Sequence, residues 1–256
     1  MRIRIIDFLI IISILLASFL YGGTGEKKEN SGYSKEYAER LLRGVDDSMY
    51  PDMYRAEMEM NTYRKNRRPL EFKYEIHSKG SGEEQRVLME ITSPARDRGK
   101  KILMTENNLW MYMPNVSRPI RLSRSQSFMG STFSNEDLAD SAWQSNYDPE
   151  IADEKDGKLL LRLSAKRSDV AYARIDMWID KETELPVKGT YYGLSGRAIK
   201  EIEFSNVGEM AGLLRPLDMK MVDLLEEGAY TEVKLIKMEE AEDLPDYMFD
   251  QTQMGR

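Results

Sequence analysis

Apolar and charged residues alternate along most of this chain, and no other feature constrains its fold as strongly. Residues 54–60 read YRAEMEM and residues 70–77 read LEFKYEIH. Because successive side chains of a β-strand point to opposite faces, each run has one apolar side and one side suited to water. The pattern predicts about eleven antiparallel strands. Besides these two runs, the segments that can supply these strands lie at residues 86–91, 101–105, 109–113, 119–123, 158–166, 170–179, 185–192, 198–204, 219–225 and 230–238, the run at 119–123 being short.

Two segments depart from this alternation. Ser34 is a typical helix N-cap, and Pro51 marks the end of the helix that it would begin. In residues 124–147 the alternation disappears, and Ser134 and Asp137 have the spacing of a capping box before a short helix. The N-terminal helix would present one apolar face, formed by Tyr37, Leu41, Leu42, Val45 and Met49.

Together these elements predict a mainly β fold. Neither a βαβ alternation nor a linker divides the sequence, so residues 24–256 are expected to form a single domain. We expect a strongly curved antiparallel half-barrel of about eleven strands. The N-terminal helix and a helical lid insertion at residues 124–147 would cover its concave face. A sheet of this kind can enclose a ligand cavity.

The first 23 residues have the composition of a secretory signal peptide. Arg2 and Arg4 precede a short apolar run at residues 8–20, and Gly22 and Gly23 follow it. The run is shorter than the roughly 20 residues that cross a bilayer as a helix. We therefore expect an exported protein with a cleaved signal peptide at residues 1–23, and an uncleaved N-terminal anchor is the alternative. The chain has no cysteine, so its stability must come from a core of ordinary size.

The composition argues against several functions. The single histidine, His77, lies on the charged face of its expected strand, which does not suit a Ser-His-Asp hydrolase. A zinc site of the usual His and Cys kind cannot be assembled. The net charge of −7 argues against nucleic acid as a partner and against permanent attachment to anionic lipid. We predict no catalytic residue, no metal and no cofactor; an enzymatic alternative would depend on Glu136 or Asp137.

Methionine and aromatic residues gather on the expected strands, and the chain has 17 methionines and 14 tyrosines. Flexible methionines and broad aromatic rings suit a variable apolar ligand such as an acyl chain. The alternative is that they fill an ordinary core under the helices. The candidate cavity residues are Tyr54, Met58, Met60, Phe72, Tyr74, Met89, Trp110, Tyr112 and Trp178.

The insertion contains a short apolar segment just before its capped helix. Phe128, Met129 and Phe133 lie in the stretch FMGSTF, whose glycine, serine and threonine favour turns. Such a stretch is suited to be a flap over the open end of the sheet, with the three apolar side chains pointing inward. The alternative is a well-packed loop that closes the core permanently.

Several segments resemble a known family. Residues 107–114, NNLWMYMP, resemble the polar turn and W-x-Y-x-P strand of the periplasmic lipoprotein-carrier (LolA/LolB-like) superfamily. Residues 176–188, DMWIDKETELPVK, resemble its D-x-x-T-x-L-P-x-K hairpin. Residues 94–103 and 128–138 are similar to a treponemal-type branch of outer-membrane lipoprotein-sorting-like proteins. The resemblance covers essentially the whole chain after the signal peptide.

The resemblance implies an eleven-stranded half-barrel with a helical lid, whose concave face binds lipid or lipoprotein acyl chains in the periplasm. It further implies traffic between the inner and outer membranes, with an inner-membrane transporter and an outer-membrane acceptor as partners; we expect a monomer. The family's acyl-binding positions do not map here by motif, so none is transferred, and the long insertion at residues 124–147 departs from its carriers. A second hypothesis is a protein-binding or sensory module whose interior is filled by its own side chains.

Overall fold

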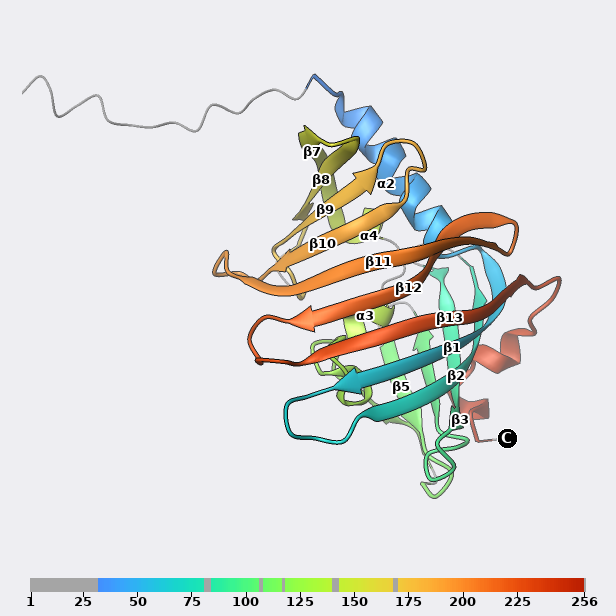
Figure 1. Ribbon diagram of the computed structural model, residues 1–256. Helices are drawn as coiled ribbons and strands as arrows, with labels where there is room; N and C mark the ends of the chain where they lie inside the picture. The colour runs from blue at the N-terminus through green and yellow to red at the C-terminus, as the bar shows by residue number, and fades with distance from the viewer. Residues whose placement is uncertain are drawn as a thin grey trace, which may run out of the picture. The chain divides into compact units, whose positions relative to one another are not determined.

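The computed structural model describes residues 32–80, 84–105, 108–116, 118–139, 143–167 and 170–255, so the expected signal peptide lies outside the described residues. One antiparallel sheet of thirteen strands dominates the fold (Figure 1). Its strands are β1 (Met53–Tyr63), β2 (Leu70–Lys79), β3 (Arg86–Ser93), β4 (Lys101–Thr105), β5 (Asn108–Tyr112), β6 (Ile120–Arg121), β7 (Tyr147–Lys155), β8 (Lys158–Ala165), β9 (Arg174–Asp180), β10 (Pro186–Tyr192), β11 (Ala198–Met210), β12 (Leu213–Asp223) and β13 (Tyr230–Glu240).

The helical elements are few and mostly short. The longest is α2 (Lys35–Met49), and none in the described ranges is both long and apolar enough to cross a membrane. The others are η2 (Phe128–Gly130), α3 (Asn135–Ala139), α4 (Trp143–Asn146), η3 (Asp246–Phe249) and η4 (Gln251–Gln253), where η marks a 3₁₀ helix.

The strand order joins two meanders. Strands β1 to β6 follow one another outward to one edge, and strands β13 back to β7 follow one another to the other edge. The two meanders meet where β1 pairs antiparallel with β13, with Met60 opposite Val233. Strands β6 and β7 therefore lie at opposite edges, and the chain between them, residues 122–146, has to cross one face of the sheet. We call residues 122–146 the crossing segment.

The mainly β, antiparallel fold with an N-terminal helix is confirmed, and two expectations are corrected. The sheet has thirteen strands rather than about eleven. Strand β7 gives no alternation signal because its sequence, YDPEIADEK, is charged and contains Pro149; an edge strand tolerates proline, since its outer N–H groups have no strand partner. The sheet is also not strongly curled or closed, because pairing stops at β6 on one side and at β7 on the other.

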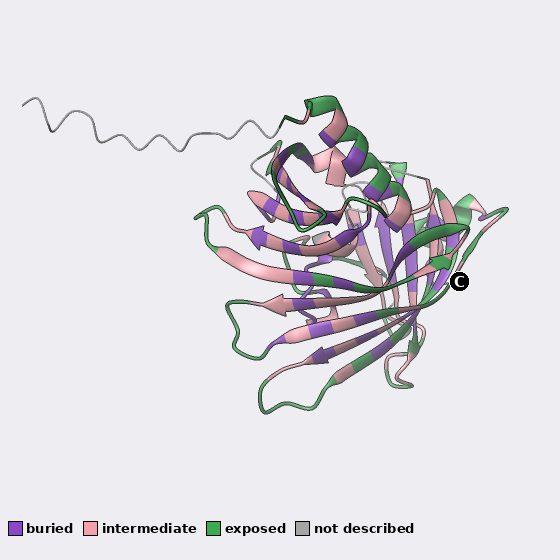
Figure 2. Ribbon diagram, turned by 45° about the horizontal axis from the view of Figure 1, so that its top comes forward, coloured by how far each residue is buried: buried purple, intermediate pink, exposed green. Residues whose placement is uncertain are grey.

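Helix α2 forms as the sequence predicts. The Ser34 side chain accepts a hydrogen bond from the Tyr37 backbone N–H at 3.2 Å, which satisfies one of the free donors at the helix start. One side of the helix is buried and the other exposed (Figure 2). Its buried residues pack into the main core and include Leu41, Leu42, Val45 and Met49, which the helical spacing predicts.

The two faces of the sheet are covered differently. The face that carries Met58, Met60 and Tyr74, here called the inner face, packs against α2 and the crossing segment in one large apolar cluster. The opposite, outer face is covered only near β3 and β4, where Leu244, Phe249 and Met254 pack on Leu88 and Leu103. The strict alternation of buried and less buried residues along β1 and β2 follows from this arrangement.

One charged side chain is buried in this core without a carboxylate. Arg215 on β12 is 1% exposed, and burial lowers the pKa of its guanidinium. Its Nη1 lies 3.5 Å from the Met49 carbonyl oxygen and 2.8 Å from Met238 Sδ. Within the described structure, Nε and Nη2 of Arg215 have no hydrogen-bond partner, and no carboxylate lies within 4.0 Å. A buried cation in this situation has lost hydration without full compensation.

We therefore predict that Arg215→Met raises the free energy of unfolding by about 1 to 3 kcal/mol, because methionine fills a similar volume without the desolvation cost. Arg215→Ala should lower the free energy of unfolding, because it leaves a cavity. Urea denaturation of the two variants and the wild type measures both effects. A methionine variant less stable than the wild type would show that the guanidinium is adequately hydrogen-bonded.

Candidate functional site

The first half of the crossing segment is fixed to the sheet by buried contacts. Phe128 is fully buried, with its ring centroid 5.8 Å from that of Tyr74. The Thr132 N–H donates to Thr231 Oγ1 at 2.9 Å, and Thr132 Oγ1 donates to the Met221 carbonyl oxygen at 2.9 Å. Residues 128–133 are thus tied to strands β2, β12 and β13, as a packed loop would be.

The second half of the crossing segment is held by polar contacts. Asp137 and Ser134 form the capping box that the sequence predicts: the Ser134 N–H donates to Asp137 Oδ2 at 2.6 Å, and the Asp137 N–H donates to Ser134 Oγ at 3.2 Å. The same Asp137 oxygen accepts hydrogen bonds from Lys200 Nζ at 3.0 Å and from the Tyr172 hydroxyl at 2.9 Å. The ion pair with Lys200 therefore joins α3 to β11, and the hydrogen bond from the Tyr172 hydroxyl joins α3 to the segment before β9.

A second polar contact joins α4 to helix α2. Asp46, buried at 3% exposure, accepts hydrogen bonds from the backbone N–H groups of Trp143 and Gln144, each at 3.0 Å. Those two donors lie at the start of α4 and have no partner within the helix. Burial raises the pKa of the Asp46 carboxyl to about 7, although the two N–H donors favour its charged form.

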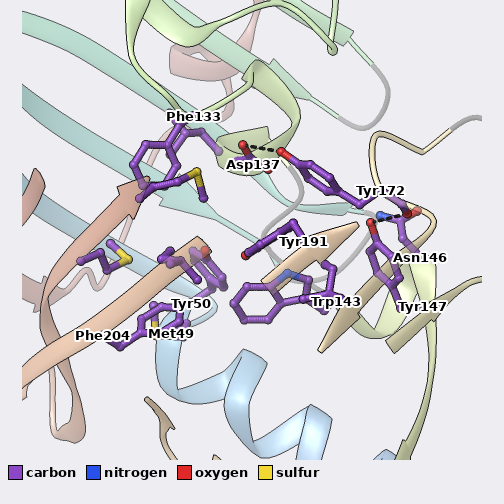
Figure 3. A pocket seen from close by; sticks show the side chains of 15 residues that line it. Met49, Tyr50, Phe133, Asp137, Trp143, Asn146, Tyr147, Tyr172, Tyr191 and Phe204 are labelled. Atoms are coloured by element: carbon purple, nitrogen blue, oxygen red, sulfur yellow. Dashed lines mark hydrogen bonds between the residues drawn. The ribbon is translucent and has the colours of Figure 1, made fainter. Parts of the chain in front are cut away.

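Under this half of the crossing segment lies a cavity of about 60 Å³ (Figure 3). In Figure 3, Tyr50, Trp143 and Tyr191 gather around it, and the Asp137–Tyr172 hydrogen bond lies along one side. The lining is mainly apolar and aromatic. It is formed by Met49, Tyr50, Phe133, Asp137, Leu138, Trp143, Asn146, Tyr147, Tyr172, Ile175, Tyr191, Ile202, Phe204, Met219 and Met221.

The electrostatic character of the cavity suits an apolar molecule. Burial raises the pKa of the Tyr50, Tyr172 and Tyr191 hydroxyls, so these phenols are neutral at physiological pH. The charged groups at its edge, Asp137 and Lys200, neutralise each other. Such a space can accept hydrocarbon and offer a few hydrogen bonds at one side. In the described residues, no group of three or more His, Asp or Glu side chains is placed to hold a metal.

The structure brings most of the sequence-predicted residues together, but away from this cavity. Nine of them belong to the inner-face cluster or pack against it: Tyr54, Met58, Met60, Phe72, Tyr74, Met89, Phe128, Met129 and Phe133. Only Phe133 lines the cavity. The others lie mainly on β1 to β3 and beneath η2, where native side chains fill the space. Whether any of these residues contacts a ligand stays a prediction.

Three aromatic residues are not on the inner face, which corrects their expected place in a concave cavity. Trp110 and Tyr112 on β5 pack against the outer-face cluster with Leu103 and Phe249, because the neighbouring Leu109 and Met111 take the inner positions. On β9, Ile175, Met177 and Ile179 are buried inward, so Trp178 lies on the opposite side, half exposed. Counting aromatic residues on a strand does not give the face that they occupy.

Apart from Phe133, sequence reasoning did not select the residues that line the cavity. Alternation along β9 to β12 places Ile175, Tyr191, Ile202 and Phe204 on one face, and Trp143 follows from the helical spacing in the insertion. These signals are present in the sequence. What the sequence does not contain is the position at which the crossing segment leaves space, since this depends on pairings between distant strands.

The fold and site define a class of protein: a single open antiparallel sheet whose apolar face is covered by a helix and a crossing segment. A family model described as "Uncharacterized protein" matches residues 83–256. The structure of a LolA superfamily protein from Nitrosomonas europaea is 30% identical and superposes with a TM-score of 0.74, covering 83% of this chain and 97% of that chain. The chain therefore belongs to the LolA superfamily. A search of curated proteins gave no match.

Two further structures share the fold at lower identity. A DUF1329 family protein from Desulfovibrio piger has a TM-score of 0.77 and 23% identity, covering 86% of this chain and 98% of that chain. A domain classed with outer membrane lipoprotein-sorting proteins, from Vibrio parahaemolyticus, has a TM-score of 0.77 and 21% identity, covering 87% and 100%. The fold is thus shared across nearly the full length of these proteins.

The buried Asp46 makes stability depend on pH in a specific direction. Because its pKa is about 7 in the folded protein, against 3.8 for an ordinary aspartate, the folded state holds one proton more between these values. The free energy of unfolding should therefore fall by about 1 to 4 kcal/mol as pH rises from 4 to 7 and then level off. Asp46→Asn should remove this slope.

Urea denaturation of wild type and variant at pH 5 and pH 8 measures the effect as a difference between the two proteins, which cancels the contributions of other groups. Asp47→Asn, at an exposed neighbouring position, is the control and should keep most of the slope. Parallel pH profiles for the wild type and Asp46→Asn would show that Asp46 ionises normally in the folded protein.

Proposed function

We propose that this protein is a non-catalytic carrier that binds lipid or lipoprotein acyl chains between its inner face and its crossing segment. The observation that supports this most is the location of the cavity. In a member of the LolA superfamily, an aromatic- and methionine-lined space lies under the second half of the crossing segment, which the Lys200–Asp137 pair and the Asp46 cap help to hold in place.

The cavity must enlarge to take such a ligand. Its volume of about 60 Å³ is far below the roughly 300 to 1,000 Å³ of typical ligand pockets. Residues 143–146 and α3 would move away from β9 to β12, while residues 128–133 keep their buried contacts. Met49, Met219 and Met221 line the space, and their unbranched side chains can repack around a variable guest.

The energy of this exchange is favourable for a long acyl chain. Each buried methylene contributes about 0.8 kcal/mol, so a sixteen-carbon chain gains on the order of 10 kcal/mol before ordering costs. Against this stand the contacts that the crossing segment gives up, chiefly the Lys200–Asp137 ion pair and the Asp46 cap of α4. A gain and a cost of comparable size permit both uptake and release.

The cellular setting is part of the same proposal. Residues 1–23 would direct export to the periplasm, and the carrier would work between an inner-membrane transporter and an outer-membrane acceptor as a monomer. The Vibrio parahaemolyticus domain, which shares this fold and is classed with outer membrane lipoprotein-sorting proteins, supports this setting. The proposal assigns no catalytic role to Glu136 or Asp137; Asp137 is engaged by Lys200 and Tyr172.

Weakening the polar contact at α3 should speed ligand entry. Lys200→Met leaves the Asp137 carboxylate without its cation, which favours exposure of α3 to water. We predict that uptake of a fluorescent fatty acid becomes several-fold faster, as measured by stopped-flow fluorescence. Lys188→Met is the matched control, because it breaks a similar pair with Glu201 at 3.3 Å on the half-exposed side of β10. Equal rates for both variants and the wild type would contradict this route of entry.

Filling the cavity should block binding without unfolding the protein. Met219→Trp adds side-chain volume comparable to the cavity, so we predict a loss of fatty-acid binding at nearly unchanged melting temperature. Met219→Leu is the control and should bind normally. Native mass spectrometry for co-purified lipid tests the same proposal on the wild type. Absence of both co-purified lipid and fatty-acid uptake would reject the carrier function.

The small volume of the cavity also favours a second candidate, a protein-binding or sensory module with a self-filled interior. In that case Phe128→Ala would lower the free energy of unfolding by about 3 to 5 kcal/mol, as expected for a buried core residue, and no variant would alter lipid uptake. The Met219→Trp experiment separates the two candidates.

A further inference from the structure

Positive charge is concentrated in three short segments of an acidic chain. Residues 64–68, 96–101 and 118–124 contain eleven of the 37 Lys and Arg residues and only one acidic residue, Asp97. The whole chain has a net charge of −7, so the remainder is strongly acidic. Net charge alone hides this asymmetry.

The fold brings the three segments to the same end of the sheet. They lie in or beside the β1–β2, β3–β4 and β5–β6 connections, and in an antiparallel meander every second connection is at the same end. The β12–β13 connection is at this end as well, because Tyr63 at the end of β1 pairs with Tyr230 at the start of β13. Figure 1 shows the β1–β2 and β12–β13 turns beside each other. We call these connections, together with the β10–β11 turn at residues 193–197, the basic end.

Some of these cations are neutralised and others are free. Arg64 pairs with Glu226 and Lys65 with Glu227, each at 3.1 Å, and Asp97 pairs with Arg96 and Lys100. In contrast, the side chains of four exposed arginines make no ion pair or hydrogen bond within the described ranges. They are Arg67, Arg68, Arg118 and Arg121.

Exposed leucines accompany these arginines. Leu225 in the β12–β13 connection is 59% exposed, and Leu194 in the β10–β11 turn is 80% exposed. Figure 2 shows exposed residues along the turns at this end. Leu225 lies in the turn beside the β1–β2 turn that carries Arg67 and Arg68. Exposed apolar side chains at the same end of a sheet as unpaired cations suit the interface of an anionic bilayer, since the leucines enter the headgroup region and the cations meet lipid phosphates.

We propose that the basic end docks reversibly onto anionic phospholipid bilayers. Each cation near such a surface strengthens binding roughly fivefold, so four free arginines suffice for a transient encounter but not for permanent attachment. The acidic remainder of the protein is repelled by the same surface, which fixes the orientation of docking. This inference does not depend on the carrier function, because docking needs no cavity.

Vesicle co-sedimentation tests the proposal. Wild-type protein should bind phosphatidylcholine vesicles that contain phosphatidylglycerol, should not bind phosphatidylcholine alone, and should dissociate at high salt. Replacing Arg67, Arg68, Arg118 and Arg121 together by serine should weaken binding at least tenfold. The matched control replaces four exposed cations elsewhere, Lys35, Arg43, Lys155 and Lys234, by serine and should bind like the wild type.

The leucines supply an independent measurement. Leu194→Ser with Leu225→Ser should weaken binding several-fold while leaving its salt dependence intact, because the charges are unchanged. Equal losses in the basic-end and control variants would overturn the proposal, since binding would then follow net charge alone. The proposal would also be overturned if the wild type bound neutral vesicles as well as anionic ones. It would be overturned, too, if the protein bound no vesicles but showed salt-sensitive binding to a soluble acidic protein. Fatty-acid uptake measured on the same variants should be normal, which separates this result from any failure of the carrier function.

Discussion

The pairing of β1 with β13 is the constraint on which the rest of this structure depends. It places the two meanders side by side in one sheet and leaves β6 and β7 at opposite edges. The chain between these edges can only run across a face, and the apolar inner face gains most from being covered. The cover over the sheet is thus a result of topology, and residues 122–146 supply the side chains that make the crossing stable.

The two halves of the crossing segment meet the sheet in different ways. Around Phe128 the contact is apolar, fully buried and supported by the hydrogen bonds of Thr132. From Asp137 onward the contact also includes buried polar groups, the Lys200–Asp137 ion pair and the Asp46 cap of α4, and separating them requires that these charged groups be hydrated again. The cavity lies under the second half of the crossing segment, and the proposed carrier function requires that half to move while the first half keeps its contacts.

Much of the fold was predictable from the sequence because it depends on local patterns. Alternation gives β1 and β2 and their buried faces, and Ser34 with the Ser134–Asp137 box gives two helix starts. Strand β7 escapes prediction because its sequence is charged and contains Pro149, and Trp110 is placed on the wrong face when its aromatic character is weighed above the apolar Leu109 and Met111 beside it. The open edges depend on which distant strands pair, and the sequence does not reveal this. The position of the cavity could not be predicted for the same reason. Its residues come from α2, the crossing segment and five strands, and only tertiary contacts bring them together.

The central position of β13 has a consequence for the order of folding. Strand β1 pairs with β13, which lies about 170 residues further along the chain. After synthesis of the first meander, one edge of β1 therefore still lacks its neighbouring strand. Loop closure over such a distance is slow, and an uncovered strand side invites pairing with other chains. Until residues 230–240 are synthesised, the chain cannot complete its sheet, and the edge of β1 that later pairs with β13 stays open to pairing with other chains.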